Sequence, residues 1–554
     1  MTEVANKSGL QDLIQEYMQA YFEANPVTAS SWLGLHQYDA RLPDLSQSSF
    51  ARRIAHLKDL ESRVGQLPAA ATEGDKESRF DRDLLVRSIQ EELFHLEDLR
   101  DHETNPMFYA NLLDVSCYIK RDYAPLTERL EALVRHLVQV PAALEAGKAT
   151  LEKALPKPVL ETALIMYEGL ITYYEQDVAA TFAKANSPEL TARFDQARET
   201  AVAALREFIQ LLKTRLPQAH FNFAIGAEKY RKMLATGEMV DLPVEKVLEV
   251  GERNLADNLR QMREVCEKIR PGSSVQEIMQ EVGKHHPTAE SLVSDTRDKL
   301  EEVRQFLIDH KIVTVPSEVR CQVQETPPFM RWAFAFMDPP GPFETVATEA
   351  FYYLTPVEPE WTEQRKEEWL TKFDYYTLQD VSVHEAYPGH YLHFLHTQLV
   401  PQPFRKMIGA YSFVEGYAHY TEQMMLEEGY ASEDLRYKVG QLVEALLRNS
   451  RYVVAIKMHT QGMSVDEATR FLMENAFMEE TPARSEAVRG TFDPGYLNYT
   501  LGKLLILKLR EDYKAEQGDK FNLQEFHDRL LAYGAPPLPL LRTMLLERDN
   551  GEIL

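Results

Sequence analysis

The sequence predicts a mainly α-helical protein of two lobes with one small β-sheet. In residues 10–21, 130–138 and 202–212, apolar side chains recur at intervals of three and four, which is the period of helices that bury one face. A proline-rich stretch at residues 314–359 interrupts this period, which returns after Trp361 and holds nearly to the C-terminus. In the first part of the chain, helix breaks are expected at Pro26, Pro141, Pro217 and Pro287.

Two short strands are expected inside the proline-rich stretch. Residues 319–323 alternate apolar and polar side chains with the period of a strand, and residues 350–354, AFYYL, are rich in strand formers. We expect AFYYL to be an edge strand. A sheet at this place marks the predicted boundary between an N-terminal helical lobe, residues 1–312, and a C-terminal lobe, residues 313–554.

The composition argues against several classes of partner. The chain has 554 residues and a formal net charge of -25, so it lacks the basic surface that nucleic acids or anionic membranes require. It contains no apolar run of about eighteen residues, the length at which a transmembrane helix is suspected. The start, MTEVANKSGLQDLIQEY, lacks the pattern of a secretion signal, and the three cysteines, Cys117, Cys266 and Cys321, are far apart. These features predict a cytoplasmic protein.

The segment VHEAYPGHYLH, residues 383–393, resembles an interrupted metal-binding helix. In the zinc motif H-E-x-x-H, two histidines four apart share one helix face, and the glutamate activates a water molecule. Here His384 and Glu385 begin that motif, but the next histidine, His390, follows after six residues and would point about 120° away on a straight helix. Pro388 and Gly389 could kink or bulge the helix and bring His390 back beside His384. A Pro-Gly pair can also simply end a helix.

A second segment, SFVEGYAHYTEQM at residues 412–424, strengthens the metal hypothesis. It is typical of a helix with Glu415, Ala418, His419 and Glu422 on one face. A glutamate on a second helix can complete a His, His, Glu set that leaves one position open for water, as in catalytic zinc sites.

Four segments together resemble a known family. They are NPVTASSWLGLHQYDARLPDLS, SVHEAYPGHYLH, FVEGYAHYTE and PGYLNYTLGKLLILKLR, of which the H-E-x-x-P-G-H motif is the most specific. The combination resembles the DUF885 family of large bacterial proteins over nearly the whole chain, from about Leu10 to about Ala532. The resemblance implies a metallopeptidase-like protein related to the gluzincins, with a mostly helical fold of the zinc-carboxypeptidase type and the small sheet beside the helix of the motif.

The resemblance also implies the roles of individual residues. His384, His390 and Glu415 would bind one zinc ion per chain, although another divalent metal is possible. Glu385 would be the general base, taking a proton from water and passing it to the leaving amine.

Further candidates lie around this core. Tyr499 is our first candidate for a donor to the oxyanion of the transition state. Tyr496 is one alternative, and His459 is another, because members of the resembled family have a histidine at that position. Arg489 could pair with the C-terminal carboxylate of a peptide or form an ordinary salt bridge. AFYYL, with Tyr352, could bind extended substrate by strand addition.

Supporting residues are also expected. Asp380 and Glu422 could orient the ligand imidazoles. His393 and His419 are expected as polar lining, and either could replace His390 as a ligand.

The sequence therefore predicts a zinc-dependent peptidase of short peptides, which would be a carboxypeptidase if Arg489 binds the C-terminal carboxylate. One alternative is a non-catalytic relative that binds peptides, and another is a metal-dependent hydrolase or lyase of a non-peptide amide. The expected partner is a peptide or small amide, with neither nucleic acid nor membrane, and no motif indicates an oligomeric state.

Overall fold

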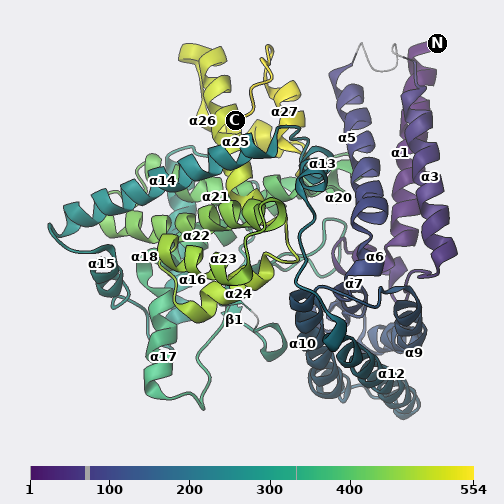
Figure 1. Ribbon diagram of the computed structural model, residues 1–554. Coiled ribbons are helices and arrows are strands. Elements are labelled where there is room, and N and C mark those ends of the chain that lie inside the picture. Colours follow the sequence, from purple (N-terminus) through teal and green to yellow (C-terminus); the bar gives the residue numbers. More distant parts are fainter. Residues whose placement is uncertain (1, 69–74, 332) are drawn as a thin grey trace. The chain divides into compact units, whose positions relative to one another are not determined.

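The computed structural model describes residues 2–68, 75–331 and 333–554, which form a mainly helical protein with a three-stranded sheet (Figure 1). The predicted fold class is confirmed at this level. The chain divides into two compact units: the first comprises Met1–Ile225 with Pro340–Thr348, and the second comprises Gly226–Pro339 with Glu349–Leu554. Within the described residues, no helix combines the length and apolar character needed to cross a membrane.

The first unit is built of helices. They are α1 (Thr2–Ala24), α2 (Pro26–Ser31), α3 (Gln47–Gly65), α5 (Lys76–Leu93), α6 (Asp101–Thr104), α7 (Met107–Leu112), α8 (Cys117–Lys120), α9 (Leu126–Thr150), α10 (Lys157–Tyr173), α11 (Ala179–Phe182) and α12 (Pro188–Arg215). The break predicted at Pro141 is wrong, because α9 continues through this proline. Leu137, Val140 and Leu144 on either side of it are buried, and α9 packs along α12, so tertiary packing outweighs the lost backbone hydrogen bond.

The second unit contains the remaining helices and the sheet. Its helices are α13 (Ala227–Gly237), α14 (Val244–Ile269), α15 (Val275–Val282), α16 (Leu292–Asp309), α17 (Glu363–Leu370), α18 (Tyr375–Glu385), α19 (His390–Leu399), α20 (Pro403–Met407), α21 (Tyr411–Glu427), α22 (Leu435–Thr460), α23 (Val465–Asn475), α24 (Glu480–Arg489), α25 (Asn498–Gln517), α26 (Leu523–Leu531) and α27 (Leu538–Leu545). Short 3-10 turns occur in both units, at His36–Tyr38, Leu216–Gln218, Pro328–Met330, Thr371–Phe373 and Gly518–Lys520. The first unit also contains π-helical turns at Phe94–Leu99 and Tyr174–Val178.

The unit boundary differs from the sequence-based boundary at residue 312. Helices α13 to α16 belong to the second unit, where α14 packs along α22 and α16 packs against α18. The boundary falls in the connection between α12 and α13, residues 216–226, which lacks the repeated prolines that set residues 314–359 apart in the sequence.

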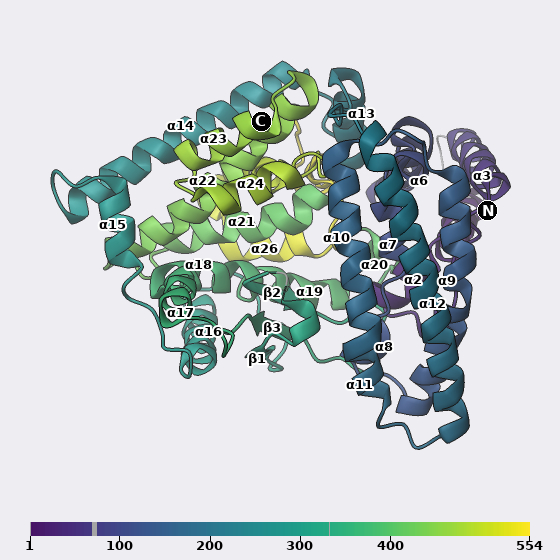
Figure 2. The ribbon, with the colours of Figure 1, turned by 60° about the horizontal axis from the view of Figure 1, so that its bottom comes forward.

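Four helices of the second unit carry the motifs. Helix α18 packs against both α21 and α22 (Figure 2). Helix α21 also packs against α25. The contact between α21 and α25 is very close, since a Cβ atom built on Gly502 would lie 1.7 Å from the carbonyl oxygen of Ser412. Glycine at residue 502 therefore permits the two backbones to approach, and it brings the face of α21 that holds Glu415 near the start of α25.

The sheet consists of β1 (Gln322–Glu325), β2 (Ala335–Asp338) and β3 (Phe351–Leu354) in the order β1-β3-β2. Strand β3 pairs with β1 in parallel and with β2 in antiparallel orientation. The prediction that AFYYL is an edge strand is therefore wrong: it forms the central strand β3, and both of its edges are already paired.

Candidate metal centre

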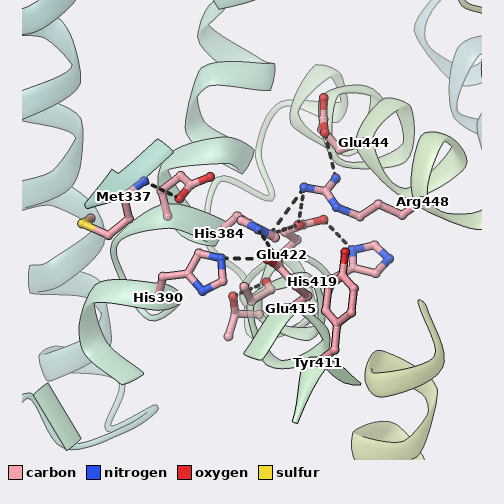
Figure 3. A network of polar contacts seen from close by, with 12 residues as sticks. Met337, His384, His390, Tyr411, Glu415, His419, Glu422, Glu444 and Arg448 are labelled. Atoms are coloured by element: carbon pink, nitrogen blue, oxygen red, sulfur yellow. Dashed lines mark hydrogen bonds and ion pairs between the residues drawn. The ribbon is translucent and has the colours of Figure 1, made fainter. Parts of the chain in front are cut away.

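Three side chains from three helices converge in the second unit. His384 near the end of α18, His390 at the start of α19 and Glu415 on α21 offer one ligand atom each, and these atoms lie within 4.8 Å of one another (Figure 3). Oε2 of Glu415 is 3.4 Å from Nε2 of His384 and 3.4 Å from Nε2 of His390. The two histidines and the glutamate that the sequence singled out as ligands thus lie together.

The chain between the two histidines turns sharply rather than bulging inside one helix. Helix α18 ends at Glu385 and α19 begins at His390. The N–H of Gly389 donates to the carbonyl of Val383 at 3.0 Å, so the turn is closed by a hydrogen bond that spans six residues. A Cβ atom on Gly389 would lie 1.7 Å from the carbonyl oxygen of His384, which only glycine avoids. The expected distortion is present, but as a break between two helices.

The chemistry of this donor set fits a divalent metal such as zinc. Two histidine nitrogens and one carboxylate oxygen are a common set at catalytic zinc sites, and two ligand atoms about 2.0–2.1 Å from a tetrahedral metal lie about 3.3–3.4 Å apart. The two distances to Glu415 Oε2 match that separation. This oxygen is buried and makes no hydrogen bond within the described part of the chain. Burial alone would raise the pKa of Glu415, but the imidazoles of His390 and His384 hold it well below its ordinary value.

A buried carboxylate fixes the orientation of the first imidazole. Oε1 of Glu422 lies 2.7 Å from Nδ1 of His384, and Oε2 lies 2.8 Å from Nδ1 of His419. Arg448 adds a contact of 3.3 Å to Oε1 of Glu422 (Figure 3). Burial alone would raise the pKa of Glu422, but Arg448 and His419 hold it well below its ordinary value. An ionised Glu422 accepts a hydrogen bond from the Nδ1–H of His384, so Nε2 is the nitrogen that would face a metal.

Glu385, the proposed base, is held by the sheet. Its Oε2 accepts a hydrogen bond of 2.8 Å from the backbone N–H of Met337 on β2. Because Glu385 immediately follows His384 in the chain, β2 places an edge of the sheet directly beside the candidate centre. No sequence pattern indicates this contact, because it uses the backbone N–H of a residue 48 positions away.

Tyr499 also lies at the centre. Its ring is roughly parallel to that of His384 with centroids 6.4 Å apart, and it contacts the ring of Tyr411 at 5.7 Å. Burial and the charge of Glu415 raise its pKa, so the hydroxyl keeps its proton at neutral pH. The hydroxyl of Tyr411 accepts from Nη2 of Arg489 at 3.0 Å, and Arg489 is also paired with Asp493 at 2.9 Å. Arg489 therefore forms the ordinary salt bridge that we weighed against substrate binding, yet it stands near the site through the two tyrosines.

The other three candidate residues contact groups other than the ligand atoms. The hydroxyl of Tyr352, a fully buried residue of β3, contacts Oγ of Ser382 at 3.3 Å, so Tyr352 is a packing residue and its predicted contact with substrate is wrong. Tyr496 is fully buried, and its hydroxyl lies against Gly490. Nε2 of His459 lies 2.7 Å from the carbonyl oxygen of Gly490. His459 is about 16 Å farther along α22 than Arg448, which contacts Glu422.

The two spare histidines have different roles. His393 is buried against Phe413 and Tyr417, and its Nε2 lies 3.3 Å from the carbonyl of Gly534, so it faces away from the ligand group. Burial lowers its pKa to about 3. His419 contacts Glu422 instead of joining the ligand atoms. Arg448 and Tyr411 belong to the site but had no recognisable sequence signal, because they come from helices whose packing brings them there.

Fold and site together define a mainly helical protein with a partly buried cluster of two histidines and a glutamate. Residues 26–545 match the family described as "Bacterial protein of unknown function (DUF885)", and the chain belongs to this family. No curated protein matches the chain.

Two solved structures share the fold. One is "a putative lipoprotein of unknown function" from Shewanella oneidensis, with a TM-score of 0.82 and 22% identity, covering 97% of this chain and 100% of that chain. The other is a "putative lipoprotein" from Colwellia psychrerythraea, with a TM-score of 0.82 and 18% identity, covering 97% of this chain and 98% of that chain.

Proposed function

We propose that this protein is a zinc-dependent peptidase that hydrolyses short peptides. The observation that carries the proposal is the convergence of Nε2 of His384, Nε2 of His390 and Oε2 of Glu415, with the carboxylate of Glu385 on the next residue. When bound by these three residues, zinc would supply a Lewis acid that makes water acidic enough to react near neutral pH.

Glu385 is the proposed general base. Its Oε2 is held by Met337, which leaves Oε1 to take a proton from the attacking water and to pass it to the leaving amine. A carboxylate anchored through one oxygen keeps its position while the other oxygen exchanges a proton. This division of roles supports acid–base chemistry by Glu385.

The outer edge of β2 is the proposed binding place for the substrate backbone. The N–H of Met337 points to Glu385 and hence away from β3, and on an antiparallel strand alternate residues face the same side. The backbone groups of Ala335 therefore also face outward, where an extended peptide could pair with them. Strand addition at β2 replaces our earlier expectation for β3.

Tyr499 is the proposed donor to the oxyanion of the transition state. Its ring lies beside His384, and its raised pKa keeps the hydroxyl protonated as a donor. Tyr411 and Arg489 would hold this side of the site in place through their mutual hydrogen bond.

The test is zinc analysis together with hydrolysis of a mixed peptide library followed by mass spectrometry. We expect about one zinc per chain and cleavage of peptides, with Glu385→Gln retaining zinc and losing about 10²–10⁴-fold in rate. Glu428→Gln, an exposed residue at the end of α21, is the matched control and should behave as wild type. Zinc binding without cleavage of any peptide would favour the non-catalytic relative, and cleavage of other amides alone would favour the non-peptide hydrolase.

We also propose a cytoplasmic location, which the three free cysteines support. The two solved relatives bear the name of lipoproteins, so fractionation of native cells is the direct test of location for this chain.

A further inference from the structure

A small recess lies in the second unit beside Glu422. Its polar lining residues are Tyr376, Gln379, Asp380, Glu422, Tyr430 and Tyr437, and the other three lining residues are apolar. Two of the six carry carboxylates, and none of the nine lining residues is a lysine, arginine or histidine. The walls therefore present negative charge, neutral oxygens and aromatic rings.

Two polar groups of the lining lack a partner. Asp380 is 6% exposed and Tyr430 is 8% exposed, and both Oδ2 of Asp380 and the hydroxyl of Tyr430 make no hydrogen bond within the described part of the chain. A buried carboxylate without a partner is costly, so it needs a proton or a cation. Burial and the neighbouring charge of Glu422 raise the pKa of Asp380, so without a cation beside it this carboxyl favours its protonated form.

The cationic side chains nearby do not fill the recess. Arg448 is bonded to Glu422 and Glu444, and Nζ of Lys438 donates to a glutamine side chain at 2.7 Å. Lys503 is buried, and its Nζ makes no hydrogen bond with any described residue, but Lys503 does not line the recess. Lys503 is thus the main competitor as the countercharge of Asp380.

We propose that the recess binds a monovalent cation of the size of potassium or ammonium through Oδ2 of Asp380, the hydroxyl of Tyr430 and the side-chain oxygen of Gln379. A divalent ion is a poorer fit, because calcium and magnesium sites draw on several carboxylates, whereas both oxygens of Glu422 are already bonded. The ring of Tyr376 contacts that of Tyr437 with centroids 4.9 Å apart, and it already attracts one cation, since the guanidinium of Arg436 lies 4.8 Å from its centroid. This site is separate from the ligand group of His384 and does not depend on the proposed peptidase activity.

The first test compares thermal unfolding of the full-length protein in potassium, ammonium, sodium and choline chloride at one ionic strength. Binding to the folded state should raise the midpoint by about 1–3 °C over choline, and the potassium and ammonium arms identify the preferred ion. Asp380→Asn should abolish the difference, while Asp309→Asn, at an exposed position on α16, should keep it.

The second test does not depend on the stability of any variant. Crystals of the wild-type protein soaked in rubidium chloride should show an anomalous peak in contact with Oδ2 of Asp380. Equal midpoints in all four salts, an equal cation effect in Asp380→Asn, or a recess without a rubidium peak would each overturn the proposal and leave Asp380 as a protonated residue or a partner of Lys503.

Discussion

Nδ1 of His384 and Oε1 of Glu422 are 2.7 Å apart, and this contact determines which nitrogen of the imidazole faces Glu415. Glu422 is fully buried and shares its other oxygen with His419, so it cannot turn away from His384 without breaking a second hydrogen bond. The candidate ligand is therefore orientated before any metal binds, which lowers the entropic cost of binding.

Replacing Glu422 should weaken zinc binding. In Glu422→Gln, the amide NH₂ group would face one of the two imidazole N–H groups, so His384 would lose its fixed orientation. We expect the affinity for zinc to fall by about 10–100-fold, measured by competition with a chelator of known affinity. Glu428→Gln should leave the affinity unchanged. An unaltered affinity in a correctly folded Glu422→Gln protein would contradict the orienting role.

Gly389→Ala should disrupt the turn between α18 and α19. The added Cβ would lie 1.7 Å from the carbonyl oxygen of His384 and 2.5 Å from that of Val383, both of which are backbone atoms. We expect a destabilisation of about 3 kcal/mol or more, together with loss of zinc, because the strain displaces both histidines. Gly409→Ala is the control, since the nearest atom to its Cβ would be 3.8 Å away. Thermal unfolding and zinc content measure both effects, and equal behaviour of the two variants would refute the strain argument.

The sequence predicted the parts of the site that depend on short-range spacing. The helical period placed Glu415 and Glu422 on one face of α21, and Pro388 with Gly389 indicated that the helix could not run straight from His384 to His390. These signals are local, because proline and glycine act on the backbone within a turn of their own position.

Long-range packing could not be read in the same way. The order β1-β3-β2 made AFYYL a central strand, and strand composition does not distinguish a central from an edge position over four residues. The contact of Met337 with Glu385 uses a backbone N–H, which every residue except proline carries. Tyr352 and His459 are chemically suited to a site, and only the packing around them shows that they are buried elsewhere.

His36 should make the first unit more stable at slightly acidic than at alkaline pH. Its Nδ1 lies 3.2 Å from Asp39 and its Nε2 lies 2.7 Å from Glu344, so both nitrogens must carry protons to serve both carboxylates. Burial lowers the pKa of His36, but the contacts with Asp39 and Glu344 outweigh this and raise it above 6.5. The stabilisation is therefore fully present below pH 6.5 and is lost as the pH rises through the higher pKa of the folded state.

The measurement is the difference in unfolding midpoint between wild type and His36→Gln as a function of pH. We expect the difference to be largest near pH 6 and to shrink toward pH 9. His220→Gln, at an exposed position, is the control and should change the unfolding midpoint little. A difference for His36→Gln that grows with pH would show that the ring acts as a neutral group.

Two tyrosines three residues apart allow the oxyanion hypothesis to be tested with a matched pair. Tyr499 lies beside His384, whereas Tyr496 is fully buried with its hydroxyl against Gly490. If the protein hydrolyses peptides as proposed, Tyr499→Phe should lower kcat by about 10²–10³-fold with little change in KM, because the lost hydrogen bond forms only in the transition state. Tyr496→Phe removes a buried hydroxyl that makes no hydrogen bond within the described residues, so it should keep both constants near wild type. Equal losses in the two variants would point to a shared structural effect, and a rise in KM alone for Tyr499→Phe would make Tyr499 a residue that binds substrate rather than one that stabilises the transition state.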